Sequence, residues 1–92
     1  MSDQPTARDM ISLPGPFRFK VILKPQGDDA QLLLALTRTA LARDPGPVQL
    51  THNPSREGKY VAYTLEVHIL EYVEIETLYG AYKNHEHTVW VI

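Results

Sequence analysis

The chain has 92 residues, which allows one small domain. It contains no cysteine, and this excludes disulfide scaffolds, thiol nucleophiles and thiolate metal sites. A formal net charge of −2 argues against a dedicated nucleic-acid-binding protein, whose affinity depends on neutralising phosphates. No apolar run approaches the roughly 18 residues of a membrane span, and the first residues have no secretion-signal pattern. We therefore expect a cytoplasmic protein with no membrane partner.

The first segment of the chain lacks hydrophobic periodicity, so residues 1–12 are predicted to form a flexible tail. Residues 13–92 are predicted to form a single domain. Alternating residues from Phe17 to Lys24 predict a half-buried strand. Its apolar side holds Phe17, Phe19, Val21 and Leu23. A helix is predicted from about Asp29 to Arg43, with Asp28 or Asp29 as its N-terminal cap. Its core-facing stripe holds Leu33, Leu34, Thr37, Ala40 and Leu41.

The second half of the chain repeats this alternation of strand and helix patterns. Val48 to Asn53 predicts a strand, residues 54–58 predict a turn, and Lys59 to Ile69 predicts a long central strand. Residues 71–83 have helical spacing of apolar side chains, and residues 88–92 predict a last strand. In that strand Val89 and Val91 are expected on the core side, and Thr88, Trp90 and Ile92 on the other. The order βαββαβ predicts an α+β ferredoxin-like sandwich, a four-stranded antiparallel sheet with two helices on one face.

Three segments carry a family resemblance. They are Leu13-Pro14-Gly15-Pro16-Phe17-Arg18-Phe19-Lys20-Val21, Pro54-Ser55-Arg56-Glu57-Gly58-Lys59-Tyr60 and Val73-Glu74-Ile75-Glu76-Thr77-Leu78-Tyr79. Together they resemble the YbeD-like family of small uncharacterised bacterial proteins. The resemblance implies a ferredoxin-like fold similar to ACT regulatory domains, which sense amino acids in metabolic enzymes. It also implies the family's provisional role, regulation of lipoate metabolism, and brings no catalytic residues.

The sheet face without helices is the first candidate site. It is expected to display Lys20, Ile22, Tyr60, Thr64, Trp90 and Ile92. An uncovered apolar and aromatic patch is typical of an interaction surface, which fits a homo-oligomer or a partner protein. RNA-binding domains of this fold stack bases on aromatic residues of the central strands. Here those strands offer only Lys20 and Tyr60 without that signature, so nucleic acid is the less favoured occupant. The alternative is a face with no binding role.

The turn after the first strand is the second candidate site, at Gln26, Gly27 and Asp28. In ACT-like domains the corresponding turn approaches a small ligand, and glycine lets the backbone come close. A small-molecule effector would bind here; the alternative is an ordinary turn before a helix. The turn has no arginine for a phosphate, and the four histidines lack the pattern of a metal site.

The sequence therefore predicts no enzyme, no cofactor and no metal. It favours a non-catalytic regulatory or interaction module, ACT-like, with the link to lipoate metabolism that the resemblance implies. The alternative is a nucleic-acid-binding protein that uses the open side of the sheet.

Overall fold

The computed structural model describes residues 12–92. In chain order the elements are β1 (Gly15–Leu23), α2 (Asp29–Leu41), β2 (Gln49–Pro54), β3 (Val61–Ile69), α3 (Tyr72–Lys83) and β4 (Thr88–Val91). This order confirms the predicted βαββαβ ferredoxin-like arrangement. The predicted flexible tail, residues 1–12, lies outside the described residues except for Ser12.

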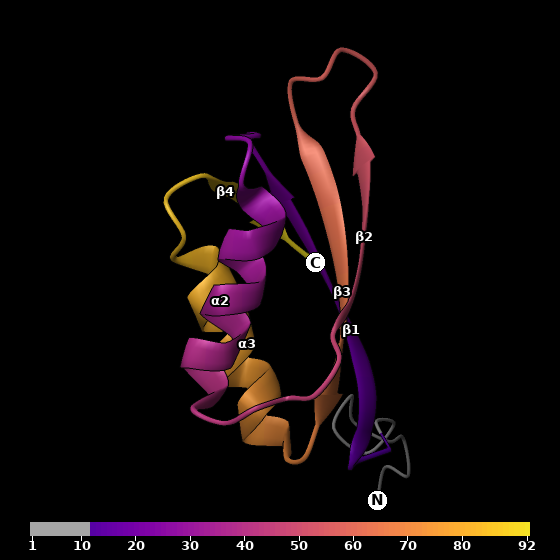
Figure 1. Cartoon of the computed structure of the whole chain (residues 1–92), viewed down its shortest axis with the longest axis vertical. Coiled ribbons are helices and arrows are strands. Elements are labelled where there is room, and N and C mark those ends of the chain that lie inside the picture. Colours follow the sequence, from indigo (N-terminus) through magenta and orange to yellow (C-terminus); the bar gives the residue numbers. More distant parts are fainter. Residues whose placement is uncertain (1–11) are drawn as a thin grey trace, which may run out of the picture.

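The four strands form one antiparallel sheet in the order β2-β3-β1-β4. The two strands with the longest alternating patterns, β1 and β3, occupy the centre and pair from Gly15 opposite Ile69 to Leu23 opposite Val61. Both helices lie on one side of this sheet, as Figure 1 shows. The other side of the sheet therefore carries no helix from residues 12–92.

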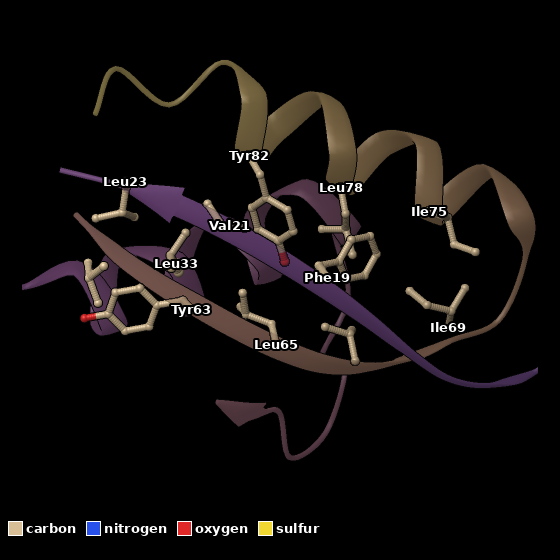
Figure 2. Packing of buried hydrophobic residues seen from close by; sticks show 12 residues of the cluster. Phe19, Val21, Leu23, Leu33, Tyr63, Leu65, Ile69, Ile75, Leu78 and Tyr82 are labelled. Atoms are coloured by element: carbon tan, nitrogen blue, oxygen red, sulfur yellow. The ribbon is translucent and has the colours of Figure 1, made fainter. Parts of the chain in front are cut away.

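The core fills the space between the sheet and the two helices (Figure 2). Its side chains with no exposed surface are Phe19, Val21, Leu23, Leu33, Leu65, Val67, Ile69, Leu78 and Tyr82. The ring centroid of Phe19 lies 5.1 Å from that of Tyr79 and 5.4 Å from that of Tyr82, and both ring pairs are edge-to-face. Full burial of each large apolar side chain contributes about 1.5–3 kcal/mol to folding. The sheet and helices are thus joined through alternate residues of β1 and β3.

One polar contact crosses the core between α2 and α3. Thr37 donates a hydrogen bond to the carbonyl of Leu33 at 2.7 Å, so its oxygen accepts one from the Tyr82 hydroxyl at 2.6 Å. Both side chains are fully buried. Burial raises the pKa of Tyr82 to about 12. The helical spacing correctly predicts Thr37 on the core side, and Tyr82 supplies the partner that its hydroxyl needs there.

The first helix is shorter than predicted and ends at Leu41 rather than Arg43. Ala42 adopts a left-handed conformation with φ of 56°, and its N–H donates to the carbonyl of Arg38. A left-handed residue of this kind ends an α-helix. Arg43 therefore leaves the helix axis and is free to contact a distant part of the chain.

The remaining element ends differ by one or two residues from the predicted ones. Two starts differ by two residues: β1 begins at Gly15 rather than Phe17, and β3 begins at Val61 rather than Lys59. The N–H of Ser55 donates to the carbonyl of Tyr60, and the N–H of Tyr60 donates to the Ser55 hydroxyl. These two bonds close the hairpin tip before the strand starts. At the other end of the sheet, β1 begins at Gly15, opposite Ile69.

The last strand contains a β-bulge that corrects the predicted faces. Ile22 lies opposite Trp90, but Leu23 lies opposite Thr88, so Val89 is an extra residue with no partner on β1. Val89 is 49% exposed, and the prediction that it faces the core is wrong. Thr88 takes the core side beside Leu23, and its hydroxyl is buried with no hydrogen-bond partner among residues 12–92.

Neither helix in residues 12–92 is long and apolar enough to cross a membrane.

Candidate functional site

The sheet side opposite the helices is formed by the strand residues that alternate with the core residues. Strand pairing aligns them in rows across the sheet. We call this surface the open face. Beyond the pair of Pro16 and His68, its rows are Gln49, Glu66 and Arg18; Thr51, Thr64, Lys20 and Ile92; and Asn53, Ala62, Ile22 and Trp90. The open face changes from polar and charged at one end to apolar at the other.

The apolar end of the open face is centred on Ile22 and Trp90, which lie opposite each other on β1 and β4. Trp90 is 63% exposed and Ile92 is 58% exposed. Two backbone hydrogen bonds, of 2.8 and 3.3 Å, hold Ile92 beside Lys20. We call Ile22, Trp90 and Ile92 the apolar strip. Exposed apolar side chains gathered in this way are typical of a surface that binds another molecule.

A shallow hollow of about 280 Å³ lies next to the apolar strip. It is lined by Lys20, Ile22, Asn53, Ser55, Tyr60 and Ala62. Thr64 lies opposite Lys20, and Trp90 lies opposite Ile22. The structure therefore brings the six residues of the predicted interaction surface into one continuous region, with Tyr60 at its edge beside the hairpin tip.

A second hollow of about 280 Å³ lies at the polar end of the open face. It is lined by Arg18, Gln49, Thr51, Thr64 and Glu66. Arg18 Nε donates to Glu66 Oε1 at 3.1 Å, and the Arg18 side chain is 77% exposed. An ion pair this exposed contributes little to stability, but it neutralises the arginine. The alternating patterns place Arg18 and Glu66 on this side of the sheet, but they do not indicate that the two side chains pair.

The predicted ligand turn is organised by a carboxylate of its own chain. Asp29 is only 4% exposed, and its two oxygens accept the N–H of Gln26 at 3.1 and 3.0 Å. One oxygen also accepts the N–H of Gly27 at 3.4 Å. Gly27 has φ of +105°, a conformation that other residues rarely adopt. The backbone donors that could approach a ligand are thus occupied by Asp29 in this conformation.

The helix cap at this turn also differs from the prediction. Asp28 occupies the N-cap position of α2, but its side chain makes no capping hydrogen bond. Asp29 is the first helical residue, and its carboxylate bonds to the preceding turn rather than to the helix. Asp28 therefore holds the predicted cap position, but neither side chain caps the helix as predicted. The turn amides occupy the Asp29 carboxylate.

A comparison of the sequence with known protein families identifies the family of this chain. Residues 8–92 match the family described as a protein of unknown function, DUF493. The chain belongs to the DUF493 family. This is the YbeD-like family that the three sequence segments resemble. No curated protein matched the chain.

Two solution structures of the protein HP0495 from Helicobacter pylori are similar to this DUF493 domain. One aligns with a TM-score of 0.77 and 20% identity, over 99% of this chain and 90% of that chain. The other, described as a hypothetical protein, aligns with a TM-score of 0.59 and 15% identity, over 99% and 98% of the two chains. At these identities the likeness shows the fold alone.

The charges of the DUF493 domain are separated between its two layers. The strands, the hairpin tip and Lys24 carry five cations and two acids, a net charge of +3: Arg18, Lys20, Lys24, Arg56 and Lys59 against Glu57 and Glu66. The helices and their other connections carry three cations and seven acids, a net charge of −4. The overall charge of −2 conceals this separation. It could have been found by counting charges element by element.

Two of the four histidines, His85 and His87, contact each other and Glu86. His85 Nδ1 accepts the N–H of His87 at 3.3 Å, and His87 Nε2 lies 3.1 Å from a Glu86 oxygen. Their rings lie 5.7 Å apart. Glu86 thus turns toward His87, unlike the extended geometry in which adjacent side chains point apart. No group of three metal-ligating side chains occurs in the described part of the chain.

Proposed function

We propose that this DUF493 domain is a non-catalytic regulatory or interaction module that binds a protein chain, either a second copy or another protein, through the apolar strip. The observation that carries the proposal is the 63% exposure of Trp90 on β4, at the edge of a sheet face that carries no helix. Covering a large apolar side chain contributes up to about 1.5–3 kcal/mol. Trp90 and Ile92 are both more than half exposed, and a few large apolar or aromatic side chains carry most of the free energy of a typical interface.

Binding rather than chemistry is supported by the polar groups of the domain. The backbone N–H groups of Gln26 and Gly27 are occupied by Asp29, and the Arg18 guanidinium is paired with Glu66. Regulation then follows from binding alone, because a partner shifts an equilibrium by its different affinity for two states. The hollow beside Tyr60 is a place for a small effector. The proposal includes two further points. A link to lipoate metabolism is supported by the family resemblance, and a cytoplasmic location is supported by the sequence pattern.

A site-specific crosslink tests this function in the cells that naturally produce the protein. A photoreactive amino acid replaces Trp90 in one variant and Val73 in a control variant. Val73 is 56% exposed but lies on α3, away from the open face. We expect protein adducts from position 90 and not from position 73. Equal adduct yields at the two positions, or none at position 90, would exclude a role for the apolar strip.

Nucleic-acid binding is the second candidate function, and the net charge of +3 on the sheet layer is the observation that favours it. Such binding weakens steeply with added salt. It would also be reduced in a Lys20→Ala and Tyr60→Ala double variant, because these residues offer a phosphate contact and a stacking surface. Binding of a protein through the apolar strip is less sensitive to salt and depends on Trp90.

A further inference from the structure

The outer edge of β4 has unused backbone groups. Lys20 and Ile92 form a hydrogen-bonded pair, because each donates its N–H to the carbonyl of the other. In an antiparallel sheet such pairs alternate with pairs that are not hydrogen-bonded, so the N–H and C=O of the adjacent Val91 point away from β1. β4 is the terminal strand of the sheet, with no strand of residues 12–92 beyond it. An edge of this kind is a template for an added strand.

The side chains beside this edge follow a charged, apolar, charged order. On β1 and just after it, Lys20, Ile22 and Lys24 alternate on the open face, and Trp90 lies opposite Ile22. Lys24 is held next to β4 by the bond from its N–H to the carbonyl of His87 at 3.0 Å. Neither lysine forms an ion pair with another residue of 12–92. Both ammonium groups are therefore available to a partner.

The opposite edge of the sheet lacks these features. β2 presents Gln49, Thr51 and Asn53 to the open face and ends at Pro54. It carries no charge, and a proline at its end is one of the ways in which proteins block strand addition. β4 has no charge or proline between Thr88 and Ile92. Of the two edges, only β4 combines a neutral apolar strand with adjacent unpaired cations.

We propose that the partner of this domain is an extended acidic segment of another protein that adds to β4 as a fifth strand. Its residues on the open-face side are acidic, apolar and acidic in turn. The apolar one packs on Trp90, and the acids lie in the same rows as Lys20 and Lys24, whose long side chains reach toward them across β4. Its intervening residues are apolar and continue the helix-covered side beyond Val91. This inference rests on the proposed function and deepens it by naming the chemistry of the partner.

The charge distribution favours such a segment over a second copy. Two-fold pairing of the open faces would bring together two layers that each carry a net charge of +3, and like charges oppose association. An acidic strand complements the same layer. The backbone hydrogen bonds of strand addition supply affinity, while the alternate side chains supply specificity.

Titration with a blocked peptide tests the inference. The probe peptide reads glutamate, valine, leucine, valine, glutamate, and the control peptide has lysine in place of both glutamates. Trp90 is the only tryptophan of the chain, so its fluorescence reports on the site, and backbone amide NMR shifts locate the contact. We expect saturable binding of the acidic peptide, with the largest amide shifts at Val91 and Ile92. The basic peptide and an acidic peptide N-methylated at both valines are expected not to bind.

Charge-reversed variants sharpen this test. Lys20→Glu is expected to weaken binding of the acidic peptide by about ten-fold, because it removes one attraction and adds a repulsion. Lys83→Glu makes the same charge change on the exposed end of α3 and is expected to leave binding within about two-fold, since screening limits distant charges. Equal losses in the two variants would overturn the proposed role of Lys20.

Other results would overturn the inference in distinguishable ways. Binding of the basic peptide, shifts confined to β2, or no binding of the acidic peptide would each reject strand addition at β4. Tighter binding of a single-stranded oligouridylate would identify the site as one for nucleic acid. Self-association lost in Trp90→Ala would identify a second copy as the occupant. If the peptide fails while position 90 still crosslinks to a protein, the proposed function stands and only the acidic-strand inference falls.

Discussion

The guanidinium of Arg43 bonds to both oxygens of Glu74, with Nε and Nη2 each 2.8 Å from its acceptor. Nη2 also donates to the carbonyl of His68 at 2.9 Å, and Glu74 accepts the N–H of Leu70 at 2.8 Å. The pair therefore joins the end of α2, the end of β3 and the start of α3. The hydrogen bond from Arg43 holds the pKa of Glu74 below its ordinary value, and the same bond raises the pKa of Arg43.

Glu74→Gln is expected to lower the free energy of unfolding at pH 7 by about 2 kcal/mol, because it removes the charge from a bidentate, partly buried pair. The folded-state pKa of Glu74 lies below its unfolded-state value. Its contribution is thus complete above about pH 5 and is lost as the pH falls through the folded-state pKa. Urea denaturation at pH 7 and pH 3 measures both effects.

The control for Glu74 is Glu57→Gln in the exposed hairpin tip, which is expected to change stability by less than about 0.5 kcal/mol. The difference between Glu74→Gln and the parent chain should shrink at pH 3. A difference that is the same at both pH values would contradict the assignment of the effect to the ionised pair.

The Thr37 and Tyr82 hydroxyls should respond unequally to deletion. Thr37→Val leaves the buried Tyr82 hydroxyl without its acceptor and is expected to cost about 1–3 kcal/mol. Tyr82→Phe is expected to cost less, about 1 kcal/mol, because Thr37 keeps its bond to Leu33. The double variant should lose less than the sum, since no hydroxyl is then unpaired. Additive losses in thermal denaturation would show that the two groups are independent.

Thr88→Val is expected to stabilise the domain by about 1 kcal/mol. The Thr88 hydroxyl is buried without a partner in the described part of the chain, and valine replaces it with a methyl group of the same shape. Thr51→Val on the exposed surface of β2 controls for the strand preference of valine. An equal gain from both variants, or a loss in Thr88→Val, would show that the hydroxyl is satisfied.

Asp29→Asn should affect both the turn and the core. The neutral amide is a weaker acceptor for the N–H groups of Gln26 and Gly27, and its buried NH₂ has no partner there, so we expect a loss of about 1–3 kcal/mol. The charge of Asp29 adds to burial in raising the pKa of Tyr63, so that pKa should fall. NMR titration of the Tyr63 ring measures it. Asp28→Asn, at an exposed residue without a side-chain cap, should leave both quantities unchanged.

The order of elements and the identity of the core could be predicted because they depend on local patterns. Alternation along β1 and β3 assigns each side chain to one face of the sheet, and residues such as Phe19 and Leu65 are buried as expected. The same alternation placed Lys20, Ile22 and Thr64 together on the open face. Family motifs that each extend over only a few residues were enough to indicate the DUF493 family.

The features that the sequence concealed depend on contacts between distant residues or on irregular backbone. Val89 alternates correctly with Val91, so nothing in the pattern indicates the bulge that exposes it. Asp29 resembles an ordinary helix cap until the turn amides are placed beside it. Arg43 and Glu74 are 31 residues apart, and their pairing follows from the left-handed Ala42 that ends α2.

The central claim is that the open face around Trp90 binds another molecule, and the single tryptophan allows a direct measurement. Fluorotryptophan is incorporated at Trp90 in the producing cells, and its ¹⁹F NMR signal is compared with that of the purified protein. A matched variant, Trp90→Phe with Val73→Trp, moves the probe to α3. We predict an in-cell shift and broadening at position 90 that exceeds the change at position 73. Equal changes at the two positions would reflect the cellular medium alone and would contradict a covered open face.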